Sequence, residues 1–358
     1  MKKQRITKIF FAVLAAALCL VLIIDSEGTV KAARQSVEVC LTAIIPSLFA
    51  FMVFSQVFIK SGIGDYLFYP LYKLNSFWFK GNRREFSIFI ISLFGGYPVG
   101  IKLLKDYIAY NKNYTAIAEK MLCYCYCGSP SFIIQIVGIS VLGSAKAGLL
   151  VYLSNIAACV TMAVIINVMP PKAERKADDK QKDNISRITV QDFTDSIADT
   201  VKALGVISGT ILAFNIVLEL IRFSGFTEIL EQLNIEKHFM SLMEISNISA
   251  FQGNSFGLLP FFAAVTSFGG LCIIIQTAAL SKGQIPLRKF ILSRFPAALL
   301  SAFYMYIINR LFPITVETVT PSGVVPALSA ADSISTACLI VMTYLLLRET
   351  KDLTSTRK

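Results

Sequence analysis

Long runs without charged residues alternate with short charged stretches along this chain. The uncharged runs cover residues 9–24, 39–59, 131–145, 147–169, 203–218, 258–280, 295–309 and 333–347, and the segment 87–104 carries one charge. A helix needs about 20 apolar residues to cross a bilayer, and shorter runs fit tilted or re-entrant helices. The pattern predicts an all-α, polytopic membrane protein with roughly eight to ten membrane segments.

Two of these segments contain residues that interrupt a membrane helix. The first interruption comprises Gly95, Gly96, Tyr97, Pro98, Gly100 and Lys102, and the second comprises Gly269 and Gly270, with Gln276 at the spacing that separates Lys102 from Gly95. Such residues leave backbone groups unpaired, and an ammonium in hydrocarbon is costly, so a run of this kind normally lines a cavity. Paired broken or re-entrant helices that face one site are typical of solute transporters. The alternative is a kink that packs against a neighbouring helix.

Composition and charge narrow the class of protein. The 358 residues are 55% hydrophobic with a net charge of +11, and the mean hydropathy of +0.63 is too high for a soluble domain. The basic residues fall between the apolar runs, which favours membrane lipid rather than nucleic acid as a partner.

The cysteines lie mostly in apolar runs, and the chain has a single histidine, so we predict no metal site and no cofactor. Nucleotide-binding and hydrolase motifs are absent, and we do not expect an enzyme.

The charges between the runs also predict orientation and domains. Basic stretches place both termini and the polar stretch 170–198 in the cytoplasm, while 225–256 and 311–332 read as external. The predicted organisation is a membrane helix with an external loop (1–38), a first repeat (39–169), a cytoplasmic linker (170–198), a second repeat (199–347) and a basic tail (348–358). The run 9–24 fits an uncleaved helix, with a signal peptide as the alternative.

The two halves resemble one another. Residues 41–67 align with 204–230 at a constant offset, which places Ser61-Gly62 on Ser224-Gly225. The charge bias makes the two copies run in opposite directions, so we predict two inverted structural repeats. An inverted arrangement needs an odd number of crossings in each half, which makes 87–104 or 131–145 re-entrant.

Lys102 and the Ser129-Pro130 pair are candidates for binding a solute. Lys102 is suited to a carboxylate or phosphate group, with snorkelling to the interface as the alternative. Ser129 and Pro130 have the residue types of a helix N-terminus, whose exposed amides also favour an anion.

Glu244 begins a polar run that fits the tip of a hairpin entering the membrane. Its carboxylate is suited to coupling H+ or Na+, with Ser246 and Asn247 as neutral ligands. The alternative is an ordinary external loop.

Four short motifs, in this order, carry a resemblance to a known family. They are Gly96 to Leu103, Ser129 to Ile133 with Val137-Gly138, Leu242 to Ser246, and Ser267 to Gly270 with Gln276. Over residues 39–311 the chain resembles the YlbJ family of sporulation integral membrane proteins, among bacterial membrane proteins with a Gate or nucleoside-recognition domain. It differs from that family in having Tyr126 and Cys127 where asparagines are expected.

The resemblance implies a function and a location. It implies a protein of sporulating Firmicutes with broken helices and paired repeats, similar to concentrative nucleoside transporters. Members of the family are linked to moving dipicolinate from the mother cell toward the forespore, which implies the mother-cell-derived outer forespore membrane. We therefore expect a transporter of a small anionic solute, with dipicolinate as the leading candidate. The alternatives are a non-transporting scaffold protein of the spore envelope and a nucleoside-like solute transporter, and the oligomeric state stays open.

This interpretation predicts the effect of removing the charge of Lys102. Lys102→Met keeps an unbranched apolar side chain and should abolish solute accumulation, whereas Lys102→Arg should retain part of it. Uptake by cells in which each variant is inserted at the wild-type level checks the prediction. Normal accumulation by Lys102→Met would return Lys102 to the snorkelling alternative.

Overall fold

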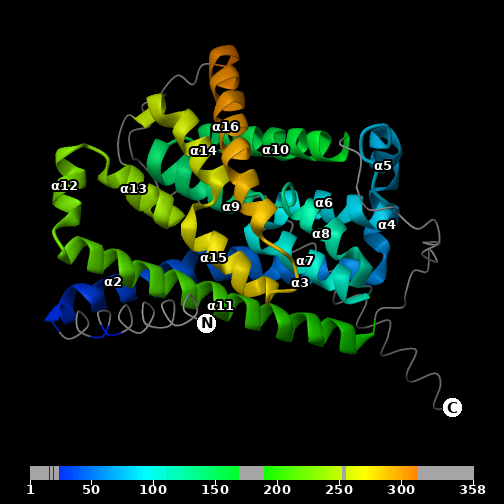
Figure 1. Ribbon diagram of the computed structural model, residues 1–358, viewed down its shortest axis with the longest axis horizontal. Helices are drawn as coiled ribbons and strands as arrows, with labels where there is room; N and C mark the ends of the chain where they lie inside the picture. The colour runs from blue at the N-terminus through cyan, green and yellow to red at the C-terminus, as the bar shows by residue number, and fades with distance from the viewer. Residues whose placement is uncertain are drawn as a thin grey trace, which may run out of the picture. The chain divides into compact units, whose positions relative to one another are not determined.

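The computed structural model describes residues 16, 19, 24–110, 112–168, 189–251 and 255–312 (Figure 1). Every regular element in these ranges is helical, which confirms the all-α class. The described residues belong to one compact unit, so the described parts of the two predicted halves share one core. The tail 348–358, the run 333–347, most of the run 9–24 and residues 169–188 of the linker lie outside the described residues.

The first half consists of short and medium-length helices followed by one long helix. Its elements are α2 (Ser26–Val39), the π-helical η1 (Cys40–Ile44), α3 (Ile45–Ser61), α4 (Ile63–Leu67), α5 (Tyr69–Asn75), α6 (Arg83–Gly95), α7 (Tyr97–Tyr110), the 3-10 helix η2 (Lys112–Tyr114), α8 (Thr115–Leu122), α9 (Pro130–Phe132), the π-helical η3 (Ile133–Val141) and α10 (Ala145–Val168). The expected external loop before residue 39 is in fact the helix α2, whose first turn is capped by the Asp25 side chain.

The second half begins with the longest helix that the structure describes. Its elements are α11 (Val190–Phe223), α12 (Phe226–Gln232), α13 (Glu236–Met243), the 3-10 helices η4 (Ile245–Ala250) and η5 (Ser255–Leu258), α14 (Leu259–Phe268), α15 (Gly270–Ser281) and α16 (Arg288–Leu311). Thr189 and Asp192 form a capping box that starts α11. Residues 190–198, expected in the linker, are therefore helical.

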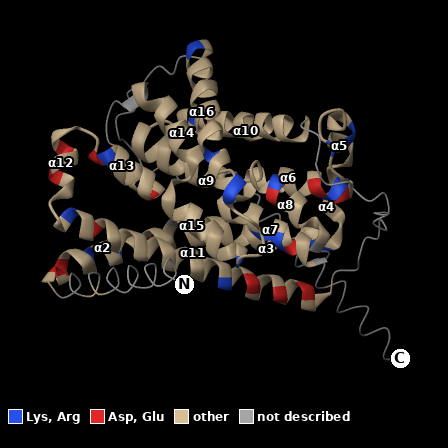
Figure 2. Cartoon of the chain, viewed as in Figure 1, with Lys and Arg blue, Asp and Glu red and all other residues tan. Residues whose placement is uncertain are grey.

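Four helical stretches among the described residues are long and apolar enough to cross a membrane. They are α10, α11, α14 with α15, and α16, and a fifth is counted if α2 and α3, bent by 47°, form one span. The expectation of roughly eight to ten segments also counted short runs and the runs 9–24 and 333–347, which lie mostly or wholly outside the described residues. The run 131–145 is only a short apolar helix, Pro130–Val141. Figure 2 shows the long helix α10 free of charged residues over most of its length.

Helix α16 presents apolar side chains outward. Leu292, Phe295, Leu299 and Phe303 are 55–72% exposed and recur at helical spacing. A face of this kind is unusual on a soluble monomer and is compatible with a membrane protein.

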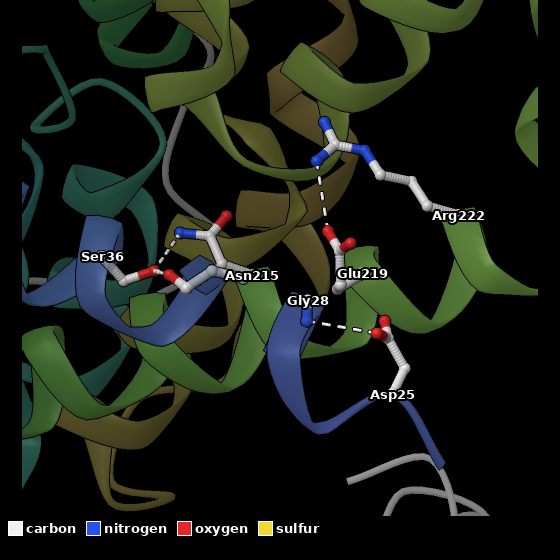
Figure 3. A network of polar contacts seen from close by, with 7 residues as sticks. Asp25, Gly28, Ser36, Asn215, Glu219 and Arg222 are labelled. Atoms are coloured by element: carbon white, nitrogen blue, oxygen red, sulfur yellow. Dashed lines mark hydrogen bonds and ion pairs between the residues drawn. The ribbon is translucent and has the colours of Figure 1, made fainter. Parts of the chain in front are cut away.

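Helix α2 lies against α11, a contact that joins the two halves. Asn215 of α11 donates from Nδ2 to Ser36 Oγ of α2 at 2.8 Å (Figure 3). Ser36 is buried, and Asn215 interrupts an apolar stretch of α11, so each polar group satisfies the other. The nearby Glu219–Arg222 ion pair, at 3.2 Å, lies within α11 itself.

The aligned Ser-Gly pairs form the same turn in both halves. Gly62 and Gly225 have left-handed φ angles of 74° and 75°, which favour glycine. Ser61 and Ser224 each donate from Oγ to the carbonyl three residues earlier, and each accepts from the amide two residues later. The alignment of these positions therefore holds in three dimensions.

Residues 123–129 pass through the interior without helical structure. Tyr124, Cys125, Tyr126 and Cys127 are each at most 2% exposed. Irregular backbone is tolerated at membrane depth only where protein surrounds it. Helix α7 packs so closely against this segment that a Cβ at Gly100 would overlap the carbonyl oxygen of Cys125.

That close approach predicts a selective cost for a methyl group. Gly100→Ala should destabilise the protein by about 1–3 kcal/mol or more, because neither backbone can move without disturbing the core. Gly209→Ala is the matched control, since Gly209 is also helical and a Cβ there would meet no neighbouring atom within 4 Å. Thermal unfolding of both purified variants in detergent checks the prediction. Equal stability of the two would contradict it.

Candidate functional site

A cavity lies where elements from both halves converge. Its empty volume is about 530 Å³, part of it open to solvent. The first half contributes Ile44, Ser47, Leu48, Gly96, Tyr97, Pro98, Ser129 and Phe132, and the second half contributes Ile207, Ile211, Glu244, Ile245, Ser246, Ile273 and Gln276.

Half of the site residues predicted from the sequence meet in this lining. They are Gly96, Tyr97, Pro98, Ser129, Glu244, Ser246 and Gln276. The lining does not include Gly95, Gly100, Lys102, Pro130, Asn247, Gly269 or Gly270. The cavity also contains two pairs of aligned positions that were not among the predicted site residues, namely Ile44 with Ile207 and Leu48 with Ile211.

The two predicted helix breaks exist and lie together. Gly96 separates α6 from α7 with a φ of 85°, and Gly269 separates α14 from α15 with a φ of 87°. The Tyr97 hydroxyl, next to the first break, donates to the carbonyl oxygen of Thr266, close to the second, at 2.5 Å. Because α14 ends at Phe268, the carbonyl groups of its last turn lose partners within the helix. One of them can therefore accept a hydrogen bond from a side chain in the other half.

A buried polar network extends from this contact into α10 and α16. Asn155 of α10 donates from Nδ2 to Thr266 Oγ1 at 2.8 Å, and Ser301 of α16 donates to Asn155 Oδ1 at 2.5 Å. All three side chains are at most 1% exposed. Both the Nδ2 and the Oδ1 atom of the Asn155 side chain thus have hydrogen-bond partners, as polar groups in an apolar interior require.

Glu244 is the single charged residue in the cavity lining. It sits between α13 and η4 and is 2% exposed, so its carboxylate lies inside the protein and not at an exposed surface. Its Oε1 accepts from the Ser246 amide at 3.2 Å, while Oε2 has no hydrogen-bond partner among the described residues. A buried carboxylate oxygen of this kind is suited to a cation, a proton or a hydroxyl donor.

Gln276 and Cys272 add polar atoms beside Glu244. Gln276 donates from Nε2 to Cys272 Sγ at 3.3 Å, one turn earlier on α15. Asn247, expected as a neutral ligand, lies outside the lining, and its buried Nδ2 has no partner among the described residues. Ser129 caps the helix that starts at Pro130, because its Oγ accepts from the Phe132 amide at 3.2 Å.

Lys102 lies one helical turn beyond Pro98, past the end of the lining. Its Nζ is buried without a hydrogen-bond partner in the described part of the chain. The charges that act on it are those of Asp106 and Asp199, which attract it, and of Lys60 and Lys105, which repel it. It therefore belongs to a charged group between α3, α7 and α11 rather than to the cavity.

The remaining predicted glycines serve close packing. A Cβ at Gly95 would collide with Phe51 and Val99, and one at Gly269 would overlap the Tyr126 hydroxyl. Gly270 packs against the backbone of α13 and η4. These residues shape the walls around the cavity without lining it.

Sequence reasoning missed Arg294, which the charge pattern assigns to a basic stretch between two apolar runs. It lies inside α16 and is 1% exposed. The available signal was its position directly before the uncharged run 295–309.

No family model, no curated protein and no solved structure matches the chain. The observations thus define an all-helical protein whose apolar helices are compatible with a membrane and whose two broken segments meet at one cavity.

The contact between the breaks predicts the effect of removing one hydroxyl. Tyr97→Phe should lower the free energy of unfolding by about 1–3 kcal/mol, because it leaves the buried Thr266 carbonyl without its donor. Tyr306→Phe is the control, since that hydroxyl bonds only at the exposed surface of α16. Thermal unfolding of both variants in detergent checks the prediction. Equal stability of the two variants would show that the contact does not stabilise the protein.

Proposed function

We propose that this chain is a multi-pass membrane transporter that binds a small solute in the cavity beside Glu244. The observation that carries the proposal is the convergence of the first helix break at Gly96, the Ser129 turn, Glu244 and helix α15, which follows the second break, on one cavity. Discontinuous helices offer unpaired backbone groups to a solute, and their meeting point is where transporters of this design bind it. The resemblance to the YlbJ family supports the same class.

Inverted repeats belong to this proposal. The identical Ser-Gly turns and the paired lining positions Ile44 with Ile207 and Leu48 with Ile211 support an internal repeat. The distribution of basic residues supports opposite orientations of the two halves, with both termini in the cytoplasm. The cell membrane, and for a sporulating host the outer forespore membrane, is the proposed location.

The proposed solute is a small anion that enters together with H+ or Na+. An ionised Glu244 would repel an anion, so binding requires a cation at the free Oε2 first. Ser129, Ser246 and Gln276 are neutral groups that could complete the coordination of that cation or of the solute. This order makes uptake depend on the cation gradient. The family resemblance makes dipicolinate the leading candidate.

A second candidate is a neutral, nucleoside-like solute. The lining contains a carboxylate and no lysine or arginine, and a carboxylate accepts hydrogen bonds from hydroxyl groups. Competition between pyridine-2,6-dicarboxylate and uridine distinguishes the two solutes.

The proposal predicts that Glu244 couples uptake to the gradient. Purified protein in proteoliposomes should accumulate labelled pyridine-2,6-dicarboxylate under an inward H+ or Na+ gradient. Glu244→Gln preserves size but removes the charge, so gradient-driven accumulation should fall about tenfold or more, as expected from the loss of a charge-assisted interaction. Glu228→Gln, at an exposed acidic residue of α12, is the control.

Each outcome has a distinct meaning. Failure of wild-type protein to accumulate either solute under both gradients would overturn transport. Normal gradient-driven accumulation by Glu244→Gln would leave transport intact and remove Glu244 from the coupling site.

A further inference from the structure

Arg294 is a fully buried cation that the cavity does not use. It lies on α16 beside the rings of Tyr126 and Phe290, whose centroids are 4.6 and 4.9 Å from the guanidinium carbon. Its Nη2 donates to the carbonyl of Cys123 and to Ser293 Oγ. These contacts attach α16 to the irregular segment 123–129.

The contacts leave part of the guanidinium unsatisfied. Nε and Nη1 are buried and have no hydrogen-bond partner among the described residues. The nearest groups include Tyr126 and three cysteines, and none of the ion pairs found among the described residues involves Arg294. A tyrosine and cysteines in their ordinary states are neutral at pH 7, so they cannot balance the charge.

Burying an unpaired guanidinium inside the protein costs free energy, because the group loses its hydration. Two ring contacts and a carbonyl offset part of the lost hydration, but free donors remain that water cannot reach. Intramembrane cations of this kind normally mark a site where an anionic group binds. The planar guanidinium also matches the paired oxygens of a carboxylate or phosphate better than an ammonium does.

Tyr126 connects Arg294 to the cavity. Its ring lies 4.9 Å from that of Tyr97, which lines the cavity, and it also contacts the guanidinium. Its hydroxyl is buried without a partner among the described residues and packs against Gly269 at the second break. Two groups with unmet hydrogen bonds, Arg294 and Tyr126, therefore lie together directly behind the cavity wall.

We infer that Arg294, with the Tyr126 hydroxyl, forms the subsite that binds a carboxylate or phosphate group of the solute. This inference rests on the proposed function and deepens it, since it separates the anion subsite from the cation subsite at Glu244. Tyr126 must move off the guanidinium for the anion to reach it, so the Tyr97–Tyr126 pair acts as the partition between the two subsites. The inference assigns to Arg294 the role that the sequence pattern predicted for Lys102, whose charged neighbours lie on α3, α7 and α11.

Binding measurements on the full-length protein in detergent test the inference. The probes are pyridine-2,6-dicarboxylate, inorganic phosphate and the uncharged pyridine-2,6-dicarboxamide, each titrated calorimetrically. Wild-type protein should bind the dicarboxylate or phosphate more tightly than the diamide. Arg294→Gln should weaken binding of that anion about tenfold or more and leave the diamide unchanged. Arg288→Gln, at the first residue of the same helix and outside the buried cluster, should bind as wild type does.

Arg294→Lys covers the case in which Arg294→Gln does not fold. It keeps the charge but loses the forked donors, so it should bind the anion less tightly than wild type. Wild-type affinity in Arg294→Lys, or in folded Arg294→Gln, would overturn the inference, as would wild-type protein that binds neither anion. Preference for the dicarboxylate over phosphate would identify the group as a carboxylate. Anion binding that depends on Arg294, in protein that accumulates no solute in proteoliposomes, would overturn transport while leaving the subsite intact.

Discussion

The stability of this protein's interior depends on hydrogen-bond partners for the backbone groups that are left unpaired where helices break inside the apolar core. Each break leaves amides and carbonyls that hydrocarbon cannot satisfy. The Tyr97 hydroxyl meets the carbonyl of Thr266, Arg294 meets the carbonyl of Cys123, and the Cys159 thiol lies 3.4 Å from the carbonyl of Tyr126. Each of these contacts joins segments that are far apart in the chain. The hydrogen bonds that satisfy these backbone groups are therefore the same ones that hold distant segments of the fold together.

The cavity follows from the same requirement. A continuous helix uses its own carbonyls and offers little to a neighbour, whereas a broken one must be met by side chains from elsewhere. Bringing Gly96 close to the segment that ends at Gly269 also brings Ser129, Glu244 and Gln276 to one place. Glu244 Oε2 and the Tyr126 hydroxyl, both without partners among the described residues, lie around this meeting point.

The sequence predicted the all-α class, both breaks and the contribution of Glu244, because glycine, proline and a carboxylate in apolar surroundings have local physical consequences. It did not predict where Lys102 and Arg294 lie. Both are single cations near the end of an apolar run, and the run alone does not specify the rotation and depth of each helix. Packing placed Arg294 among aromatic rings and Lys102 among charged residues. The start of α11 was missed for a similar reason, since a charged helical end resembles a linker in composition.

The position of α10 has a consequence for biosynthesis. This last helix of the first half packs against α14 and α16 of the second half. The Asn155 amide on α10 is satisfied by Thr266 and by Ser301, which is 146 residues further along the chain. At about 5–20 residues per second, the ribosome needs roughly 7–30 s to make that stretch. Until the end of that interval, the Asn155 amide of the nascent chain lacks at least one of its final partners.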